Sequence, residues 1–318
     1  YDRIVQSQPS ARVLISLEHH WDPAKFDEPA AKSPLLSGQT FLKGFAARVG
    51  KRKWRVAYHP YPPNLLKTSF GALDHSEHGK ITYGNIGVLL GWLHQNFPNK
   101  SHVHEVQLTE SGVNGVSPHA TQSDQKAGVC LSLRNALAVP GIINYVYHRM
   151  KDHPVETAQG LGLGLFDANS KPKQAWSAWA LANRDDLKPP KLSCGFETLP
   201  YVRLTRGYNA KKGHWATTGM LPVGFKAENS WRLKRKSFAG SKLLFACQVG
   251  THSLVTPDPK CEGQLALGPV GYAAAKTASG LVALRRCVVG GGKDHFISAH
   301  PTCEGQKQES VLGYVWPG

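Results

Sequence analysis

The sequence changes character near Leu187, and this change constrains the fold more than any other feature. The stretch DDLKPPKL at 185–192 combines charge with two prolines, which is typical of a linker. Before it, apolar strand-like stretches alternate with helical ones. After it, short strand-like stretches alternate with glycine-rich turns. The sequence therefore predicts an α/β domain over 1–186, a linker over 187–194 and an all-β domain over 195–318.

The first domain is expected to contain four parallel strands. The strand candidates are 12–18, 54–60, 103–110 and 142–148, and helix candidates at 33–50, 81–96 and 123–138 lie between them. Alternation of strands with helices implies parallel pairing, and in such folds functional groups gather where the strands end. The residues at the strand ends are therefore the first candidates for a site.

These strand ends are rich in polar and aromatic side chains. Because side chains alternate along a strand, Glu18 shares a face with His20, and His59 shares one with Tyr61. Four strands that deliver such groups at one edge indicate a cleft for hydroxyl-rich ligands, in which aromatic rings bind sugars and carboxylates perform acid/base or nucleophilic chemistry. The candidates are Glu18, His20, Trp21, His59, Tyr61, Asn64, Glu110 and His148.

Five stretches resemble a known family. They are SARVLISLEHHWD (10–22), WRVAYHPYPPNL (54–65), ITYGNIGVLLGWL (81–93), VQLTESGVNG (106–115) and LGLFDANSKPKQAWSAW (163–179). In this order they resemble the later part of a bacterial family of glycoside-hydrolase-like (β/α)8 barrels, within the broad group of retaining enzymes whose nucleophilic glutamate ends strand seven. The resemblance covers 1–182, and SLEHHW, YHPYP and TESG are its most specific parts.

The resemblance implies roles for these residues. Glu110 in TESG matches the nucleophile, which attacks the anomeric carbon and forms a glycosyl-enzyme that water resolves. Glu18 is a candidate for the second carboxylate, and the alternative for it is a structural hydrogen bond to a neighbouring strand or histidine. The implied substrate-binding residues are His20, Trp21, His59 and Tyr61, and Asn64 and His148 are further candidates for that role.

The same resemblance implies that the barrel is partial. A complete (β/α)8 barrel takes about 250 residues. The region 1–186 contains only four strand candidates, and the Asn-Glu pair that carries the family's acid/base occurs nowhere in the chain. We expect a second polypeptide, released by cleavage, to supply the first half. The alternatives are completion by a symmetry-related copy and a shortened domain that has lost catalysis.

The second domain contains three similar segments, at 201–225, 243–272 and 283–314. Each runs through an apolar strand and a glycine-rich turn to a histidine that opens another strand. These histidines, His214, His252 and His295, are expected to hold turns together. Three such repeats predict a β-trefoil-like domain, with a propeller fragment as the alternative.

The repeats also resemble modules with His-x-x-Ser/Thr and CEGQ motifs that are appended to exported bacterial hydrolases. This resemblance implies binding of carbohydrate or of a cell surface. The aromatic residues Tyr208, Trp215 and Phe296 are the candidates for contact with the ligand, because they are expected to be exposed.

Four of the six cysteines follow the repeats. Cysteines in the first strands of repeats two and three are each followed by Cys-Glu-Gly, which predicts the disulfides Cys247–Cys261 and Cys287–Cys303. Each would stabilise the fold by about 2–4 kcal/mol. Cys130 and Cys194 have no evident partners, and are free, joined to each other, or bonded to the second polypeptide. Paired cysteines indicate export to an oxidising compartment.

The net charge and the absence of certain motifs limit the classes of partner and cofactor that the sequence predicts. The chain has 38 Lys and Arg residues against 22 Asp and Glu residues, a formal charge of +16, which favours an anionic partner such as an acidic polysaccharide. No nucleic-acid-binding motif occurs, and neither HExxH nor paired CxxC spacing occurs, so nucleic acid, metal and cofactors are not predicted. The chain begins at Tyr1 without a leader and has no apolar run long enough for a membrane span, so we expect a processed, secreted protein.

These observations lead to one principal hypothesis. The sequence predicts a secreted retaining glycoside hydrolase that acts on a polysaccharide, with Glu110 as nucleophile and a C-terminal binding domain. The alternative is a lectin-like carbohydrate-binding protein built on a decayed barrel, without catalysis.

Overall fold

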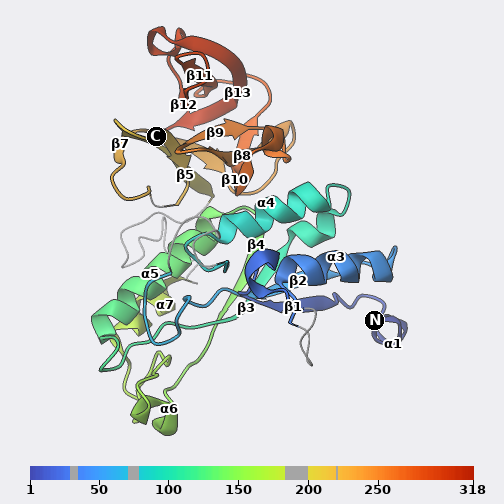
Figure 1. The fold of residues 1–318 in the computed structure, drawn as a ribbon, viewed down its shortest axis with the longest axis vertical. Helices are drawn as coiled ribbons and strands as arrows, with labels where there is room; N and C mark the ends of the chain where they lie inside the picture. Colours follow the sequence, from blue (N-terminus) through green and yellow to red (C-terminus); the bar gives the residue numbers. More distant parts are fainter. Residues whose placement is uncertain (29–34, 71–78, 183–199, 220) are drawn as a thin grey trace. The chain divides into compact units, whose positions relative to one another are not determined.

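The computed structural model describes residues 1–28, 35–70, 79–182, 200–219 and 221–318. They form one parallel sheet of four strands and one antiparallel sheet of nine strands (Figure 1). The chain divides into two compact units. The first comprises Tyr1–Ile86, Phe97–Ser132 and Gly141–Asn183, and the second comprises Gly87–Asn96, Leu133–Pro140 and Arg184–Gly318. The predicted linker over 187–194 lies outside the described residues.

The parallel sheet has the strand order β1-β2-β3-β4, which is also the order along the chain. Its strands are β1 (Leu14–Glu18), β2 (Arg55–His59), β3 (Val106–Ser111) and β4 (Ile142–Tyr147). The helices are α1 (Asp2–Ser7), α2 (Pro23–Phe26), α3 (Gly38–Val49), α4 (Ile86–Asn96), α5 (Gln122–Ala138), α6 (Pro154–Ala158) and α7 (Gln174–Ala182). The four strands and the three helices predicted from the sequence are therefore confirmed.

One predicted detail of β3 is wrong. The sequence pattern extends this strand back to residue 103. The structure instead has the short 3-10 helix η1 (Ser101–His104), followed by β3. Within it, His104 Nε2 hydrogen-bonds the Phe97 carbonyl oxygen at 3.0 Å, a local turn contact that a strand would not allow.

Burial along the strands explains the arrangement of the sheet. β2 lies between β1 and β3, and its residues Val56, Ala57 and Tyr58 are buried. On the edge strand β1, Leu17 is buried whereas Glu18 is exposed. Period-two alternation thus gives β1 one apolar face toward the core and one polar face.

The predicted (β/α)8 barrel is wrong for the described part of the chain. The four parallel strands form an open sheet with β1 and β4 at its edges, and the next described strands belong to the antiparallel sheet. Four strands are too few to close a barrel, because a closed barrel that side chains can fill has about eight.

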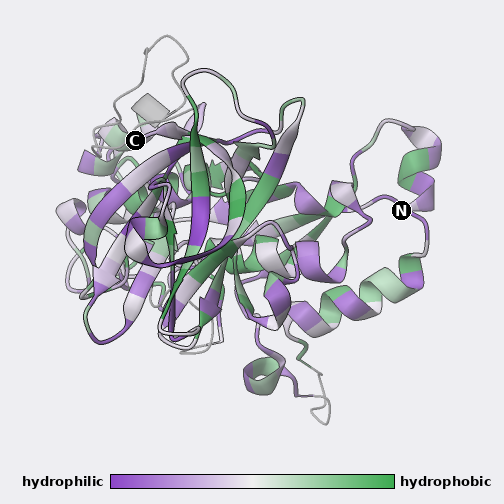
Figure 2. Cartoon of the chain, turned by 90° about the horizontal axis from the view of Figure 1, so that it is seen from above, coloured by the Kyte–Doolittle hydropathy of each residue, from purple (hydrophilic) through white to green (hydrophobic). Residues whose placement is uncertain are grey.

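The antiparallel sheet contains the rest of the strands. They are β5 (Tyr201–Asn209), β6 (Gly213–Thr217), β7 (Lys226–Lys234), β8 (Ser241–Val249), β9 (His252–Thr256), β10 (Leu265–Ala274), β11 (Val282–Val289), β12 (Asp294–Ser298) and β13 (Lys307–Pro317). Along β5, Val202 and Leu204 are buried while Arg203 is exposed, and similar alternation of hydrophilic and hydrophobic segments is visible along strands in Figure 2. The buried side chains of β5, β7, β8, β10, β11 and β13 form one hydrophobic core.

The predicted β-trefoil-like domain is also wrong. β13 pairs with β11, β10 and β7, and β7 pairs with β5, so the strands of all three repeats join in one nine-stranded sheet. Sequence repetition indicates similar units, but it does not indicate which edges of successive units form hydrogen bonds with one another.

The repeats place their histidines differently from the sequence pattern. β6, β9 and β12 each have five residues, and their first positions are Gly213, His252 and Asp294. His214 and His295 take the second position, where β9 has a serine. The three histidines are therefore not equivalent. The turns that precede these strands have different lengths. The spacing of the three histidines in the sequence therefore does not give their positions in the strands.

These side chains link different repeats. The His214 ring shares a hydrogen bond of 2.6 Å with Asp294, whose other oxygen accepts one from the His214 backbone N–H at 2.9 Å. His252 Nε2 and His295 Nδ1 lie 3.0 Å apart. These contacts join repeat one to repeat three and repeat two to repeat three, as expected for histidines with a structural role.

Both predicted disulfides are present, Cys247–Cys261 and Cys287–Cys303, each with its Cα atoms 5.7 Å apart and its cysteines completely buried. The second cysteine of each pair opens a short 3-10 helix, η2 (Cys261–Gly263) or η3 (Cys303–Gly305). Cys130 is disulfide-bonded, and Cys194 lies outside the described residues.

Candidate active site

Glu110 lies at the carboxyl end of β3, next to a buried tyrosine. The Tyr61 hydroxyl donates a hydrogen bond of 2.7 Å to Glu110 Oε1. Tyr61 follows β2 and is only 8% exposed, and its backbone N–H donates to the His59 carbonyl oxygen at 3.0 Å. Prolines precede and follow it, and their fixed φ angles restrict this turn. The packing of Tyr61 therefore holds its hydroxyl against the carboxylate.

A second set of polar side chains crosses the same end of the sheet. Glu18 and His59 are direct partners in the β1–β2 ladder, and Glu18 Oε1 lies 2.8 Å from His59 Nδ1. On its other side the imidazole contacts Thr109 Oγ1 at 3.1 Å and Ser16 Oγ at 3.3 Å. The imidazole thus connects the ends of β1, β2 and β3. Glu18 is the solvent-facing end of this set, because its side chain is 62% exposed and that of His59 is 14% exposed.

Electrostatics keep Tyr61 protonated. Burial, the hydrogen bond to Glu110 and the negative charges of Glu110 and Glu18 all raise the pKa of Tyr61 above its usual range. A neutral hydroxyl therefore faces Glu110 across the physiological pH range, so it can donate to the carboxylate. Glu110 accepts a hydrogen bond from Tyr61, and the negative charge of Glu18 also raises the pKa of this tyrosine. Tyr61 therefore links the two carboxylates electrostatically.

His20 lies beside this region. Its ring contacts those of His19 and Phe26, each with a centroid distance of 4.6 Å. Burial and the nearby charge of Lys80 lower the pKa of His20, and Glu18 partly opposes that shift. The neutral imidazole is therefore favoured near pH 7, with hydrogen-bonding capacity at both ring nitrogens.

The glycine of TESG has a steric role. A Cβ atom added at Gly112 would collide with the His148 carbonyl oxygen. At the same place the His148 backbone N–H donates to the Ser111 carbonyl oxygen at 2.9 Å. Only glycine permits this close approach of the chain after β3 to the chain after β4. Gly112 therefore permits the path that the backbone takes two residues after Glu110.

Asn114 was missed as a site residue. It is completely buried, and its amide group donates to the carbonyl oxygens of Leu66 and Gly160 and accepts from the Gly162 backbone N–H. It therefore joins the loop after Tyr61 to the loop near Gly160. The signal in the sequence is a single asparagine within VNGV, a polar residue in an otherwise apolar stretch.

The surroundings of three predicted substrate-binding residues differ from those of the Glu110 and Glu18 region. Trp21 is completely buried, and its ring packs edge-to-face against that of Tyr58 with a centroid distance of 6.2 Å. The ring that was predicted to face a sugar therefore lies in the core. Asn64 is exposed, and its Oδ1 accepts a hydrogen bond of 2.9 Å from the Leu66 backbone N–H. His148 Nε2 lies 3.3 Å from Arg149 Nε.

The aromatic candidates of the second unit also differ from expectation. Trp215 and Phe296 are buried, at 7% and 5% exposure, while Tyr208 is 40% exposed. The sequence does not distinguish these cases, since strands with bulges and hairpin ends turn aromatic residues inward as readily as outward.

The described residues show neither a metal cluster nor a membrane-spanning helix. Within the described ranges, no three or more His, Cys, Asp and Glu side chains are grouped so that they would hold a metal ion. Among the helices described, none is long and apolar enough to cross a bilayer. Two buried disulfides are typical of proteins that fold in oxidising compartments.

Comparison with known proteins shows the family. A solved structure with similarity is that of a family 39 glycoside hydrolase from the gut symbiont Bacteroides cellulosilyticus WH2, with a TM-score of 0.34 and 15% sequence identity. The match covers 67% of this chain and 43% of that one, so this chain spans less than half the length of that protein. No curated protein matches. One family model matches residues 1–188, more than half of the chain, and the protein therefore belongs to a family of unknown function (DUF5722).

Proposed function

We propose that the protein is a glycoside hydrolase that works by double displacement, with Glu110 as the nucleophile. The observation that carries the proposal is the hydrogen bond of 2.7 Å from the buried Tyr61 hydroxyl to Glu110 Oε1. A retaining hydrolase needs an ionised carboxylate held in one orientation, and a neutral donor of this kind provides both the charge stabilisation and the orientation.

The chemistry would proceed in two steps. With Oε1 engaged by Tyr61, Oε2 of Glu110 is the oxygen that attacks the anomeric carbon, and the glycosidic oxygen leaves with a proton. Water then attacks the same carbon and releases Glu110. We propose Glu18 as the second carboxylate, which gives and takes that proton. His59 contacts Glu18 Oε1, so Oε2 of Glu18 would face the leaving group.

Surroundings of the carboxylates favour a sugar as substrate. His20 presents a largely neutral imidazole, and Thr109 and Ser16 add hydroxyls at the same end of the sheet. Such groups match the alternating donors and acceptors of a sugar ring. The disulfides and the net charge of +16 support a secreted enzyme that acts on a polysaccharide, including an acidic one.

The test uses a mechanism-based label. The full chain is incubated with a panel of 2-deoxy-2-fluoroglycosides that have activated leaving groups, and peptide mass spectrometry locates the adduct. The proposal expects one glycosyl adduct on Glu110 in the wild type and none in Glu110→Gln. The matched control is Glu105→Gln, which alters a half-buried carboxylate just before β3, paired with Arg55. An adduct on a different residue would overturn the assignment of Glu110.

The second candidate function is glycan binding without catalysis. The observation that favours it is the exposure of Glu18, because an acid/base catalyst usually lies in a site that excludes water. Release of reducing ends from a polysaccharide panel separates the two functions. A binder retains glycans without releasing ends, and its glycan affinity is unchanged in Glu110→Gln.

A further inference from the structure

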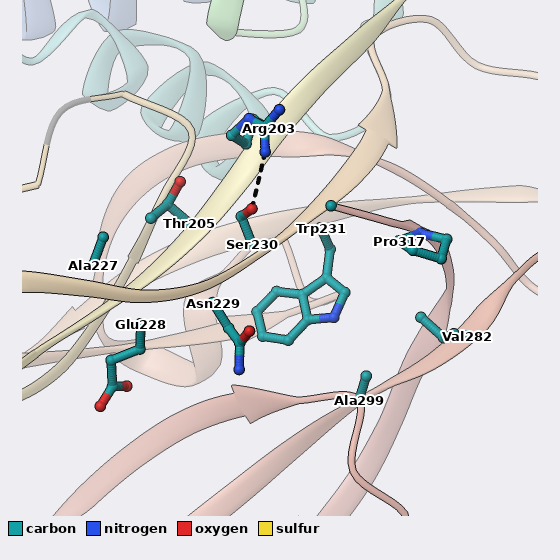
Figure 3. A pocket seen from close by; sticks show the side chains of 11 residues that line it. Arg203, Thr205, Ala227, Glu228, Asn229, Ser230, Trp231, Val282, Ala299 and Pro317 are labelled. Atoms are coloured by element: carbon teal, nitrogen blue, oxygen red, sulfur yellow. Dashed lines mark hydrogen bonds between the residues drawn. The ribbon is translucent and has the colours of Figure 1, made fainter.

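A cavity of about 560 Å³ lies in the second unit, between β5, β7, β11 and β13 (Figure 3). The Arg203 guanidinium in its wall donates to Ser230 Oγ at 3.1 Å, and the Glu228 carboxylate lies 2.9 Å from Arg206 Nε. These charged side chains are therefore engaged by their neighbours in the sheet. The buried polar side chain whose role is still unassigned, Asn114, lies in the first unit.

Asn114 holds the loop that carries Tyr61. This loop follows β2, and the Asn114 amide donates to the carbonyl oxygen of Leu66 at 2.9 Å. The Lys80 ammonium holds the same loop at the Pro63 carbonyl oxygen, at a distance of 3.0 Å. Lys80 is only half-buried, whereas Asn114 is completely buried. The Leu66 end of the loop is therefore fixed by a hydrogen bond for which water does not compete.

The amide of Asn114 is used to its full capacity. Its Nδ2 also donates to the Gly160 carbonyl oxygen at 3.0 Å, and its Oδ1 accepts from the backbone N–H groups of Gly162 at 2.8 Å and Val116 at 3.4 Å. A primary amide has two donor hydrogens and an oxygen that accepts two hydrogen bonds. Ionised aspartate has the same shape but no donor, so the hydrogen bond to Leu66 requires the amide.

The chain between Glu110 and Asn114 is held in place as well. The Val113 backbone N–H donates to the Tyr147 hydroxyl of β4 at 3.2 Å, and the Gln125 amide donates to the Val113 carbonyl oxygen at 3.0 Å. Gln125 is completely buried. Asn114 therefore extends from a fixed segment, and through Leu66 it fixes the loop of Tyr61 relative to that segment.

The position of the backbone ladder explains why such a link is needed. The pairing of β2 with β3 ends at Tyr58 and Leu108, before the chain reaches Tyr61 and Glu110. Beyond this ladder, side chains join the two strand ends. The Tyr61–Glu110 contact thus lies between the ladder on one side and the contact of Asn114 on the other.

We infer that Asn114 is a positioning residue for the proposed hydrolase. By holding Leu66 it keeps the Tyr61 hydroxyl on Glu110 Oε1, and Oε2 then stays directed at the anomeric carbon. The effect on the rate rests on the proposed function, whereas the effect on the Tyr61–Glu110 contact does not. Orientation acts on the reacting complex, so loss of Asn114 slows glycosylation and leaves the affinity for the glycoside nearly unchanged.

Labelling kinetics test the effect on the rate. The full-length variants Asn114→Ser and Asn114→Ala are incubated with the 2-deoxy-2-fluoroglycoside that labels Glu110 in the wild type. The maximal labelling rate should fall by about 10- to 100-fold, while the half-saturating concentration stays within about two-fold. Folded variants that label at the wild-type rate would overturn the inference. Failure of both variants to fold would also overturn it, because Asn114 would then serve the fold alone.

The control for lost stability is Val103→Ala. Val103 is completely buried in η1, which precedes β3 and lies at the other end of this strand from Glu110. This variant should unfold at a lower urea concentration than the wild type and still label within about two-fold of its rate. An equal fall of the labelling rate in Val103→Ala and Asn114→Ser would show that any loss of stability slows the reaction, and would refute a positioning role.

Carbon NMR of ring-labelled tyrosine tests the contact without any glycoside. The Cζ signal of Tyr61 is identified by its loss in Tyr61→Phe, and it should move in Glu110→Gln, where the acceptor is neutral. It should move in the same direction in Asn114→Ser and stay in place in Val103→Ala. An unmoved signal in Asn114→Ser would overturn the inference. Absence of an adduct on wild-type Glu110 would refute the hydrolase instead, and the tyrosine signal would still decide whether Asn114 holds Tyr61 on Glu110.

Discussion

Replacing Tyr61 with phenylalanine tests the central contact of the proposed site. The variant keeps the buried ring and removes the hydroxyl that donates to Glu110 Oε1 at 2.7 Å. A hydrogen bond to a charged group stabilises it by about 1.5–3 kcal/mol. Because about 1.36 kcal/mol corresponds to a factor of ten in rate, kcat/KM should fall by about 10- to 100-fold in Tyr61→Phe.

The direction of the effect follows from the geometry. The Tyr61 hydroxyl holds Oε1 of Glu110, so without it the carboxylate can rotate and presents Oε2 to the anomeric carbon less often. The rate at which the 2-deoxy-2-fluoroglycoside labels Glu110 should therefore fall together with kcat/KM, and peptide mass spectrometry measures that rate.

Tyr208→Phe is the control, because it removes a tyrosine hydroxyl from an exposed position in the antiparallel sheet. It should leave both kcat/KM and the labelling rate within about two-fold of the wild type. A fall of less than about two-fold in Tyr61→Phe would refute the reasoning, since the hydrogen bond would then contribute less than about 0.4 kcal/mol to the reactive arrangement.

Three further predictions concern stability. Gly112→Ala should lower the free energy of unfolding by at least about 1–3 kcal/mol in urea titration, because its methyl group would meet the His148 carbonyl oxygen; a neutral effect would show that the backbone there yields. Replacing Cys287 and Cys303 together with serine should cost about 2–4 kcal/mol in the same assay, and an unchanged urea midpoint would contradict this. Burial lowers the pKa of His252 below its usual 6.5, so its neutral form is favoured in the fold and stability should fall as the pH drops below that value. In His252→Gln the urea midpoint should depend less on pH between about 7.5 and 5.5, and an unaltered slope would exclude this residue as the cause.

The sequence predicted the local structure of the first unit better than its architecture. Apolar runs identify β1 to β4, and polar residues at their ends indicate the candidate site, because both signals are local. The Tyr61–Glu110 contact joins the ends of two neighbouring parallel strands, so it could be anticipated from the polar residues at those ends. How many strands complete a sheet is not a local property, and the barrel expected from family resemblance is not what the described residues form.

Burial of single aromatic residues was the least predictable feature of the site. Trp21 follows Glu18 and His20 in an exposed-looking motif, yet its ring packs on Tyr58 in the core. The chain leaves β1 after Glu18, so the alternation along this strand no longer determines the burial of Trp21. Asn114 illustrates the opposite case. A polar residue that satisfies three backbone groups is fully buried, and only the folded loops show that requirement.

The polar contacts between repeats are clearer in the structure than in the sequence. Glu262, in the CEG of repeat two, accepts from Thr256 of its own repeat and pairs with Arg286 of repeat three at 2.6 Å. Glu304, in the CEG of repeat three, accepts from Ser298 at 2.6 Å and pairs with a buried arginine, Arg206, of repeat one at 2.8 Å. Each CEG glutamate therefore ties its own strand to the arginine of the next repeat.

The third such contact, from repeat one to repeat two, lacks both partners. Arg206 and Arg286 oppose Ala216 and Ile297 in their ladders, and the residue at the matching position of repeat two is Ala246. Repeat one has no Cys-Glu-Gly sequence to supply the glutamate. An arginine buried without its carboxylate would leave an uncompensated charge, which costs several kcal/mol. Glutamate and arginine are therefore coupled across the repeat boundary, and the absence of one accounts for the absence of the other.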